Sequence, residues 1–212
     1  MELKIIETNI QFRNALSERN TTSRIVLHHS ASNASTKYND IHMWHLNNGW
    51  SGIGYHYVIH SDGGVYRGRP EWARGSHAYQ DEKHEANSNG VGICLSGNFQ
   101  LDNPTEAQMQ SLTLLIHDIW TRYPGIPVIG HKDVMPTACP GENFPWAELN
   151  ERLKEVGRVT YKTLNDVPDW GKPVIQKLLA KGSLKGDGDG NINISDDMLR
   201  TFIILDREGV FK

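Results

Sequence analysis

Short apolar segments rich in β-branched residues alternate along this chain with longer segments whose apolar residues recur at helical spacing. Runs such as Arg24–His28 and Val91–Leu95 are typical of buried strands. The strongest helical pattern follows Thr105, which forms a capping-box pattern with Gln108, and its apolar positions are Met109, Leu112, Ile116, Ile119 and Trp120. Interleaved strands and helices predict an α/β (α+β) body with a central mixed β-sheet flanked by helices.

The remaining segments of this body are shorter. The patterns predict strands over 54–60, 65–67 and 128–130 and helices over 36–48 and 146–156. Residues 68–90 are polar and lack periodicity, and a loop of this length in a compact domain is typical of a functional segment. Residues 1–19 carry a modest apolar set, which we expect to pack on the body.

The chain of 212 residues is long enough for one domain of ordinary size and a small second unit. A linker-like stretch near residue 157 predicts a body over 1–157 and a second, helical unit over 158–212. Helices are expected near 174–180 and from Ser195 to Arg207. Because so short a unit buries little apolar surface alone, we expect it to dock on another surface or to form a homodimer.

Charge and hydropathy exclude several kinds of partner. The formal net charge is −3 without long runs of either sign, so there is no electrostatic reason to expect a nucleic-acid partner. No apolar stretch is long enough for membrane insertion, and Met1–Asn20 lacks the apolar centre of a signal peptide. We therefore expect a cytoplasmic location until the protein is released.

His131 and Cys139 lie in a short segment between Gly130 and Gly141 that also contains Pro136 and Pro140. Imidazole and thiolate ligands together suit zinc, and a catalytic zinc site needs three protein ligands and an open position. His28 and His29 are the candidates for the third ligand. Neighbours on a strand face opposite ways, so only one of them is expected to bind, and spacing alone leaves the choice open.

Other interpretations of these residue types are weaker. Two histidines and a cysteine also bind copper in blue-copper sites, but the predicted helices, the expected cytoplasmic location and the separation of the first ligand from the others count against that class. The pairs His42 with His45 and His56 with His60 are more typical of packing or surface roles. Cys94 lies in an apolar run and is expected to be a core residue.

Several segments between about residue 10 and residue 150 form a recognisable series. In chain order they are Leu27-His28-His29-Ser30-Ala31-Ser32, Trp44-His45 with Gly49-Trp50, Gly54-Tyr55-His56-Tyr57, Asp62-Gly63, Gly75-Ser76-His77-Ala78, Asn89 through Gly97, Thr105 through Leu112, and His131 with Cys139-Pro140-Gly141. With these segments the chain resembles the zinc N-acetylmuramoyl-L-alanine amidases of phages and bacteria, which are related in fold to peptidoglycan recognition proteins.

The resemblance implies a zinc ion held by His28, His131 and Cys139, because the family's first ligand precedes the Ser-Ala pair by two positions. It also implies a catalytic role for Tyr55. Thr137 stands where similar phage members carry a catalytic lysine, and its hydroxyl can donate a hydrogen bond but carries no charge. The substrate-binding residues are expected in the loop 68–90, at Trp72, His77 and Asn89.

The implied activity is hydrolysis of the amide between N-acetylmuramic acid and L-alanine in bacterial cell-wall peptidoglycan, by a phage or prophage endolysin. The main alternative is a recognition module that binds peptidoglycan without cutting it, and a third class is a regulatory protein that binds another protein.

The unit 158–212 weakly resembles an S-layer-homology-like unit, which implies attachment to the cell wall. The acidic run Asp187–Asn193 is also compatible with calcium. We favour a solvated turn, because Ile192 takes the place of the glycine that a calcium-binding loop needs at its sixth position.

Overall fold

The protein is described here from a computed structural model in which residues 3–78, 85–156 and 160–211 are placed. The chain divides into two compact units, Met1–Leu153 and Lys154–Lys212. Residues 79–84 of the predicted loop and residues 157–159 at the predicted boundary lie outside the described residues.

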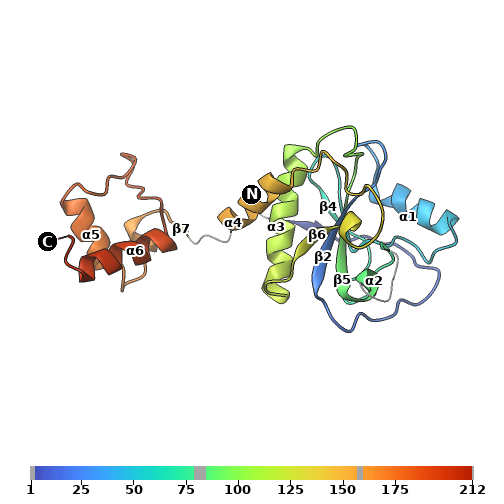
Figure 1. The fold of residues 1–212 in the computed structure, drawn as a ribbon, viewed down its shortest axis with the longest axis horizontal. Helices are drawn as coiled ribbons and strands as arrows, with labels where there is room; N and C mark the ends of the chain where they lie inside the picture. The colour runs from blue at the N-terminus through green and yellow to red at the C-terminus, as the bar shows by residue number, and fades with distance from the viewer. Residues whose placement is uncertain (1–2, 79–84, 157–159, 212) are drawn as a thin grey trace. The chain divides into compact units, whose positions relative to one another are not determined.

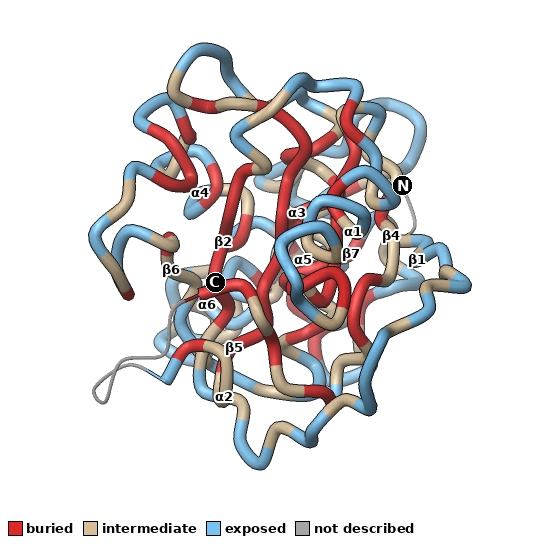
Figure 2. Tube along the Cα trace, turned by 90° about the vertical axis from the view of Figure 1, so that its right-hand side faces the viewer, coloured by how far each residue is buried: buried red, intermediate tan, exposed pale blue. Residues whose placement is uncertain are grey.

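A six-stranded mixed sheet forms the centre of the first unit (Figure 1). Only β3 and β4 pair antiparallel, and all other neighbouring strands are parallel. In spatial order the strands are β1 (Ile5–Ile6), β4 (Val65–Arg67), β3 (Tyr57–Ile59), β5 (Gly90–Leu95), β2 (Arg24–His29) and β6 (Val128–Gly130). Figure 2 shows that the trace is buried along most of β2 and β5, as expected for central parallel strands. The predicted central mixed sheet is confirmed.

The long helix α3 (Glu106–Arg122) covers one face of this sheet, and α4 (Trp146–Val156) packs against the same core. The predicted capping box is present, because Thr105 Oγ1 accepts from the Gln108 amide and Gln108 Oε1 accepts from the Thr105 amide. The core between helix and sheet contains Ile25, Leu27, Tyr57, Ile59, Ile93 and Leu95 from the strands and Met109, Leu112, Leu115, Ile116 and Ile119 from α3.

The helix α1 (Tyr38–Asn47) lies on the other side of the sheet, where Ile41 packs with Val58 and Cys94. Ile10 and Phe12 of the N-terminal segment pack on the same cluster. Successive side chains of a strand point to opposite faces. His28, whose register partner is Cys94, therefore faces the α1 side.

Some elements differ from the sequence expectation. The strand predicted over 54–60 is regular only from Tyr57 to Ile59, although the His56 amide still donates to the Gly92 carbonyl. Strand β1 and the helix α2 (Ala86–Asn89) were not predicted, because two and four residues are too few to show periodicity. In the described parts of the chain, none of the helices has the length and apolar character needed to cross a bilayer.

The second unit has an apolar core of its own, although its short length predicted little buried apolar surface. The helices α5 (Lys172–Ala180) and α6 (Asp196–Arg207) accompany a two-stranded antiparallel sheet of β7 (Thr160–Tyr161) and β8 (Ile194–Ser195). A short 3₁₀ segment lies at Leu164–Asp166. Ser195 caps α6 as predicted, and its Oγ accepts from the Met198 amide. The core contains Tyr161, Val167, Val174, Ile175, Leu178, Ile192, Ile194 and Leu199.

The acidic turn of this unit satisfies its own hydrogen bonds. Asp187 Oδ1 accepts from the amides of Asp189 and Asn191, and Asp187 Oδ2 accepts from the Asn191 side chain at 2.8 Å. The Asp187 carboxylate therefore accepts hydrogen bonds within its own turn, which supports the solvated-turn interpretation.

Candidate metal centre

The structure brings His28, His131 and Cys139 together, with one donor atom from each within 4.8 Å of the others. Strand pairing explains how two of them meet. Leu27 of β2 is the register partner of Gly130 of β6, so His28 and His131 follow these partners at the same edge of the sheet. Their ring centroids are 4.4 Å apart.

The loop after β6 returns Cys139 to the two imidazoles. It begins with a 3₁₀ turn over His131–Asp133, and the Lys132 amide donates to the Cys139 carbonyl at 2.8 Å, which closes the loop. Gly141 ends it with a φ of 113°, and a Cβ at this position would lie 2.3 Å from the Phe99 carbonyl carbon. A side chain at residue 141 would therefore displace the segment that carries Cys139.

The electrostatic environment keeps both imidazoles neutral. Burial lowers the pKa of His28 well below its usual range, with further lowering by His77 and His131. Burial and His29 lower the pKa of His131 to about 4. Burial raises the pKa of the Cys139 thiol to about 11, although the His29 amide opposes this shift. Neutral imidazoles are the form that binds a metal, and a bound cation is what stabilises a buried thiolate.

One pair of donor atoms has a separation close to that expected at a tetrahedral zinc ion. His28 Nδ1 lies 3.8 Å from Cys139 Sγ, close to the separation of about 3.6 Å that the usual Zn–N and Zn–S bond lengths produce at a tetrahedral angle. His131 Nε2 is buried and has no hydrogen-bond partner among the described residues. A buried ring nitrogen without a partner is costly in a protein interior unless a ligand engages it.

Tyr55 lies beside the cluster, just before β3, with its ring centroid 5.0 Å from that of His28. Burial raises the pKa of its phenol well above the usual value, with contributions from Cys94 and Cys139. The hydroxyl is therefore protonated near neutral pH and is able to donate a hydrogen bond. Thr137 is part of the loop itself, where its Oγ1 accepts from the Cys139 amide at 3.3 Å.

A cavity of about 420 Å³ opens at the cluster. Its lining residues are Trp50, Ser76, His77, Ala78, Asn87, His131 and Met135. The cavity thus places one candidate metal ligand, His131, in the wall of a space large enough for a substrate fragment.

Of the three residues expected to bind substrate, the structure brings one to this cavity. His77 lines it and is buried, with Nδ1 3.0 Å from His28 Nε2. Asn89 does not line it, whereas Asn87 does. Sequence reasoning missed Asn87, because nothing in an aperiodic loop distinguishes two asparagines that are two positions apart.

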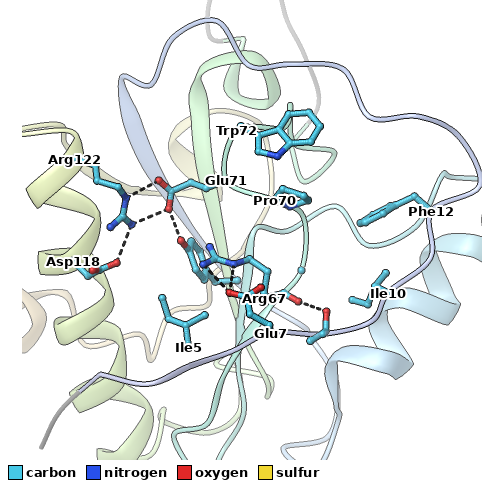
Figure 3. Close-up of a pocket in the computed structure, with 13 residues that line it drawn as sticks. Ile5, Glu7, Ile10, Phe12, Arg67, Pro70, Glu71, Trp72, Asp118 and Arg122 are labelled. Carbon is cyan, nitrogen blue, oxygen red and sulfur yellow. Dashed lines mark hydrogen bonds and ion pairs between the residues drawn. The ribbon is translucent and has the colours of Figure 1, made fainter.

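Trp72 lies in a separate pocket of about 630 Å³, bordered by β1, the N-terminal segment and the end of α3. Figure 3 shows its indole near Pro70, while the neighbouring Glu71 points the other way, toward Arg122. The indole is 54% exposed. The structure therefore does not place Trp72 in the cavity beside the candidate metal ligands.

The other paired histidines hold backbone segments in place. His42 Nδ1 accepts from the Ile53 amide and His45 Nδ1 accepts from the Gly54 amide, which joins α1 to the segment before Tyr55. His60 Nε2 accepts from the Tyr38 amide at the start of α1. These contacts agree with the expected packing roles.

The chain is similar in sequence and in fold to known proteins. The family model described as N-acetylmuramoyl-L-alanine amidase matches residues 18–142. The endolysin of Klebsiella phage KP32 is 39% identical over 142 residues, which cover 63% of this chain and 91% of that protein. The endolysin of Escherichia phage T7 is 38% identical over 150 residues, covering 67% of this chain and 93% of that protein.

Solved structures of similar fold include an amidase and a recognition protein. The N-acetylmuramoyl-L-alanine amidase LysC from Clostridium intestinale URNW has a TM-score of 0.66 and 40% identity, covering 71% of this chain and 97% of its own. The bumblebee peptidoglycan recognition protein SA has a TM-score of 0.60 and 27% identity, covering 70% of this chain and 95% of its own. This chain belongs to the N-acetylmuramoyl-L-alanine amidase family.

Proposed function

We propose that this protein is a zinc-dependent endolysin that hydrolyses the amide between N-acetylmuramic acid and L-alanine in cell-wall peptidoglycan. The single observation that carries the zinc dependence is the convergence of His28, His131 and Cys139, of which His131 lines a cavity. Zinc held by these side chains would supply a Lewis acid that activates water and polarises the scissile carbonyl.

The surrounding side chains have roles that follow from their chemistry. Tyr55 keeps its proton and donates a hydrogen bond to the oxygen that gains negative charge in the transition state. Thr137 offers a neutral hydroxyl near Cys139. Because it carries no charge, its stabilisation of that oxygen is weaker than a lysine would provide. Trp50, which is 43% exposed at the cavity, is suited to contact a sugar ring of the substrate.

The competing function is binding of peptidoglycan without cleavage. Catalysis is favoured because the three candidate ligands and Tyr55 occur together in one site. A turbidity assay on purified cell walls, with and without a chelator, separates the two functions. Mass spectrometry of the digest should then detect new free amino termini on L-alanine. Walls that remain intact in the presence of zinc would instead support the recognition module.

We also propose that the second unit attaches the enzyme to the cell wall. The family match at 18–142 ends before this unit begins. Its α6 carries a pocket of about 460 Å³ lined by Trp170, Arg200, Ile203, Ile204 and Arg207. The Arg200 guanidinium lies over the Trp170 ring, 5.6 Å from its centroid. An exposed aromatic ring beside two cations suits a polymer that combines sugars with anionic groups.

Truncation after residue 158 and the single substitution Trp170→Ala test this attachment. Both should reduce co-sedimentation with cell walls while leaving cleavage of short soluble peptidoglycan fragments unchanged. Unchanged co-sedimentation would remove the attachment role. If light scattering gives the molar mass of a dimer for the wild-type protein and of a monomer for the Trp170→Ala variant, the pocket belongs to a homodimer interface instead.

A further inference from the structure

His77 makes a specific contact with the imidazole of a candidate metal ligand. The two ring nitrogens of His28 face different partners, since Nδ1 lies 3.8 Å from Cys139 Sγ and Nε2 lies 3.0 Å from His77 Nδ1. If His28 presents Nδ1 to the ion, its proton is on Nε2. That N–H then donates to His77 Nδ1, and the contact is a hydrogen bond to the outer nitrogen of a ligand.

Two glycines make room for the His77 ring. A Cβ on Gly92 would lie 2.4 Å from His77 Cδ2, and a Cβ on Gly75 would lie 2.5 Å from the same atom. Neither glycine has a positive φ, so the backbone conformation does not require them. Gly92 lies in the interior of the central strand β5, where glycine is unfavourable unless another group approaches closely. These positions therefore accommodate the ring.

Hydrogen bonds also hold the backbone around His77 in place. Asn87 Oδ1 accepts from the amides of His77 and Ala78 at 2.7 and 2.9 Å, and the Asn87 side chain also donates to the Ala78 carbonyl. One residue earlier, the Ser76 amide donates to the Gly54 carbonyl. These hydrogen bonds hold the backbone of His77, and the contact with His28 holds its ring.

We propose that His77 is a positioning residue of the metal centre, which accepts a hydrogen bond from His28 and so fixes the orientation and tautomer in which His28 binds the ion. This inference rests on the proposed use of zinc. It gives His77 a role different from the substrate contact expected from the sequence. It also accounts for the burial of the His77 ring against Gly75 and Gly92, although His77 is one of the residues that line the cavity.

The test compares the zinc affinity of the full-length protein and its variants by competition with a chromophoric chelator. His77→Ala should weaken zinc binding by roughly 10- to 100-fold, as is typical when the partner of a metal-bound histidine is removed. His77→Asn should retain most of the affinity, because Asn Oδ1 occupies nearly the same place as His Nδ1 and also accepts a hydrogen bond. The visible spectrum of the cobalt-substituted protein should change in the alanine variant and resemble wild type in the asparagine variant.

His60→Ala is the matched control. His60 is also a buried histidine, but its Nε2 accepts from the Tyr38 amide, and it lies at the end of β3 against Tyr38 and Tyr66. This variant should keep the wild-type zinc affinity. Circular dichroism on each protein before metal addition shows whether the fold is retained, and the asparagine variant separates loss of the acceptor from loss of the ring.

Two results would overturn the inference. One is a His77→Ala protein that folds and binds zinc within about twofold of wild type. The other is a His77→Asn protein that loses as much zinc affinity as the folded His77→Ala protein, because the hydrogen-bond acceptor would then have no role. A raised KM at unchanged zinc affinity in His77→Ala would make His77 a substrate contact. If the wild-type protein itself binds no zinc, the proposed function fails, and that result is distinct from both.

Discussion

Leu27 and Gly130 are register partners across the parallel strands β2 and β6, and each is followed directly by a histidine that reaches the candidate metal centre. The pairing brings His28 and His131 to one edge of the sheet, and the closed loop returns Cys139 to them. The candidate site therefore depends on one strand pair and one loop. The contribution of each residue can be tested by its own substitution.

Removal of a ligand should abolish cell-wall lysis. His131→Ala and Cys139→Ser each leave two of the three donors. Loss of the hydrogen-bond partner of a metal-bound histidine typically costs up to about 100-fold, so we expect loss of a ligand itself to reduce lytic activity by more than roughly 100-fold. The measurement is the initial rate of turbidity loss, with zinc content by mass spectrometry. His117→Gln is the control, because that ring contacts the Leu153 carbonyl in the α3–α4 region. Full lysis by the His131→Ala protein would contradict the assignment.

Tyr55→Phe should slow catalysis without weakening zinc binding. The variant retains the ring that packs near His28 and removes only the hydroxyl. Loss of one donor to the developing oxyanion typically reduces kcat by about 100- to 1,000-fold. Cleavage of a soluble muramoyl-peptide and chelator competition are measured on the same preparation. A wild-type kcat would show that the hydroxyl has no catalytic role.

Thr137 is expected to contribute through its hydroxyl rather than its methyl group. Thr137→Ser keeps the oxygen that accepts from the Cys139 amide, whereas Thr137→Val removes it at nearly constant volume. Serine should therefore retain activity and valine should lose about tenfold, near the 1.4 kcal/mol of one hydrogen bond. Equal rates for the two variants would argue that the hydroxyl is dispensable.

Acid should destabilise the fold partly through His56. This side chain is fully buried, its Nδ1 accepts from the Gly92 amide, and burial and Arg19 lower its pKa to about 3. A histidine with a lowered pKa in the folded state stabilises the fold above its unfolded pKa, and this contribution is lost as pH falls toward the folded value. Between pH 7 and pH 5 this group alone should lower the free energy of unfolding by about 2 kcal/mol.

Chemical denaturation at the two pH values measures this dependence. The His56→Gln variant cannot titrate at this position, so the difference between its stabilities at pH 7 and pH 5 should be smaller than that of the wild-type protein. Because the candidate ligands titrate in both proteins, the comparison isolates His56. An identical pH dependence in both proteins would count against the prediction.

Glu71 should stabilise the first unit through its contacts with Arg122 and Tyr57 in the pocket that contains Trp72 (Figure 3). Burial alone would raise its pKa, but hydrogen bonds from Arg122 and Tyr57 outweigh burial and lower it. Glu71→Gln leaves Arg122 with a weaker partner, and we expect unfolding to require about 1–3 kcal/mol less. Glu106→Gln, which alters the exposed pair with Arg152, is the control and should change stability little. Zinc affinity should be unchanged in both variants.

The elements whose signals are local could be predicted from the order of the amino acids alone. The spacing of Met109, Leu112 and Ile116 with the Thr105 cap defines α3, and the β-branched run before His28 defines β2. Likewise, His131 and Cys139, two of the three candidate ligands, lie in one short segment of the chain. Such patterns can be read directly because the periods of helices and strands depend only on neighbouring residues.

Only the tertiary structure decided which side chains share the site. The register of β2 with β5 and β6 turns His28 toward Cys139, while His29 accepts from the Phe99 amide on the other side. Within the aperiodic loop, hydrogen bonds to Gly54 and Asn87 hold the segment of His77 beside the candidate metal centre, and Trp72 lies in another pocket. Positions set by non-local hydrogen bonds leave no periodic signal in the chain, which is why sequence reasoning did not separate these residues.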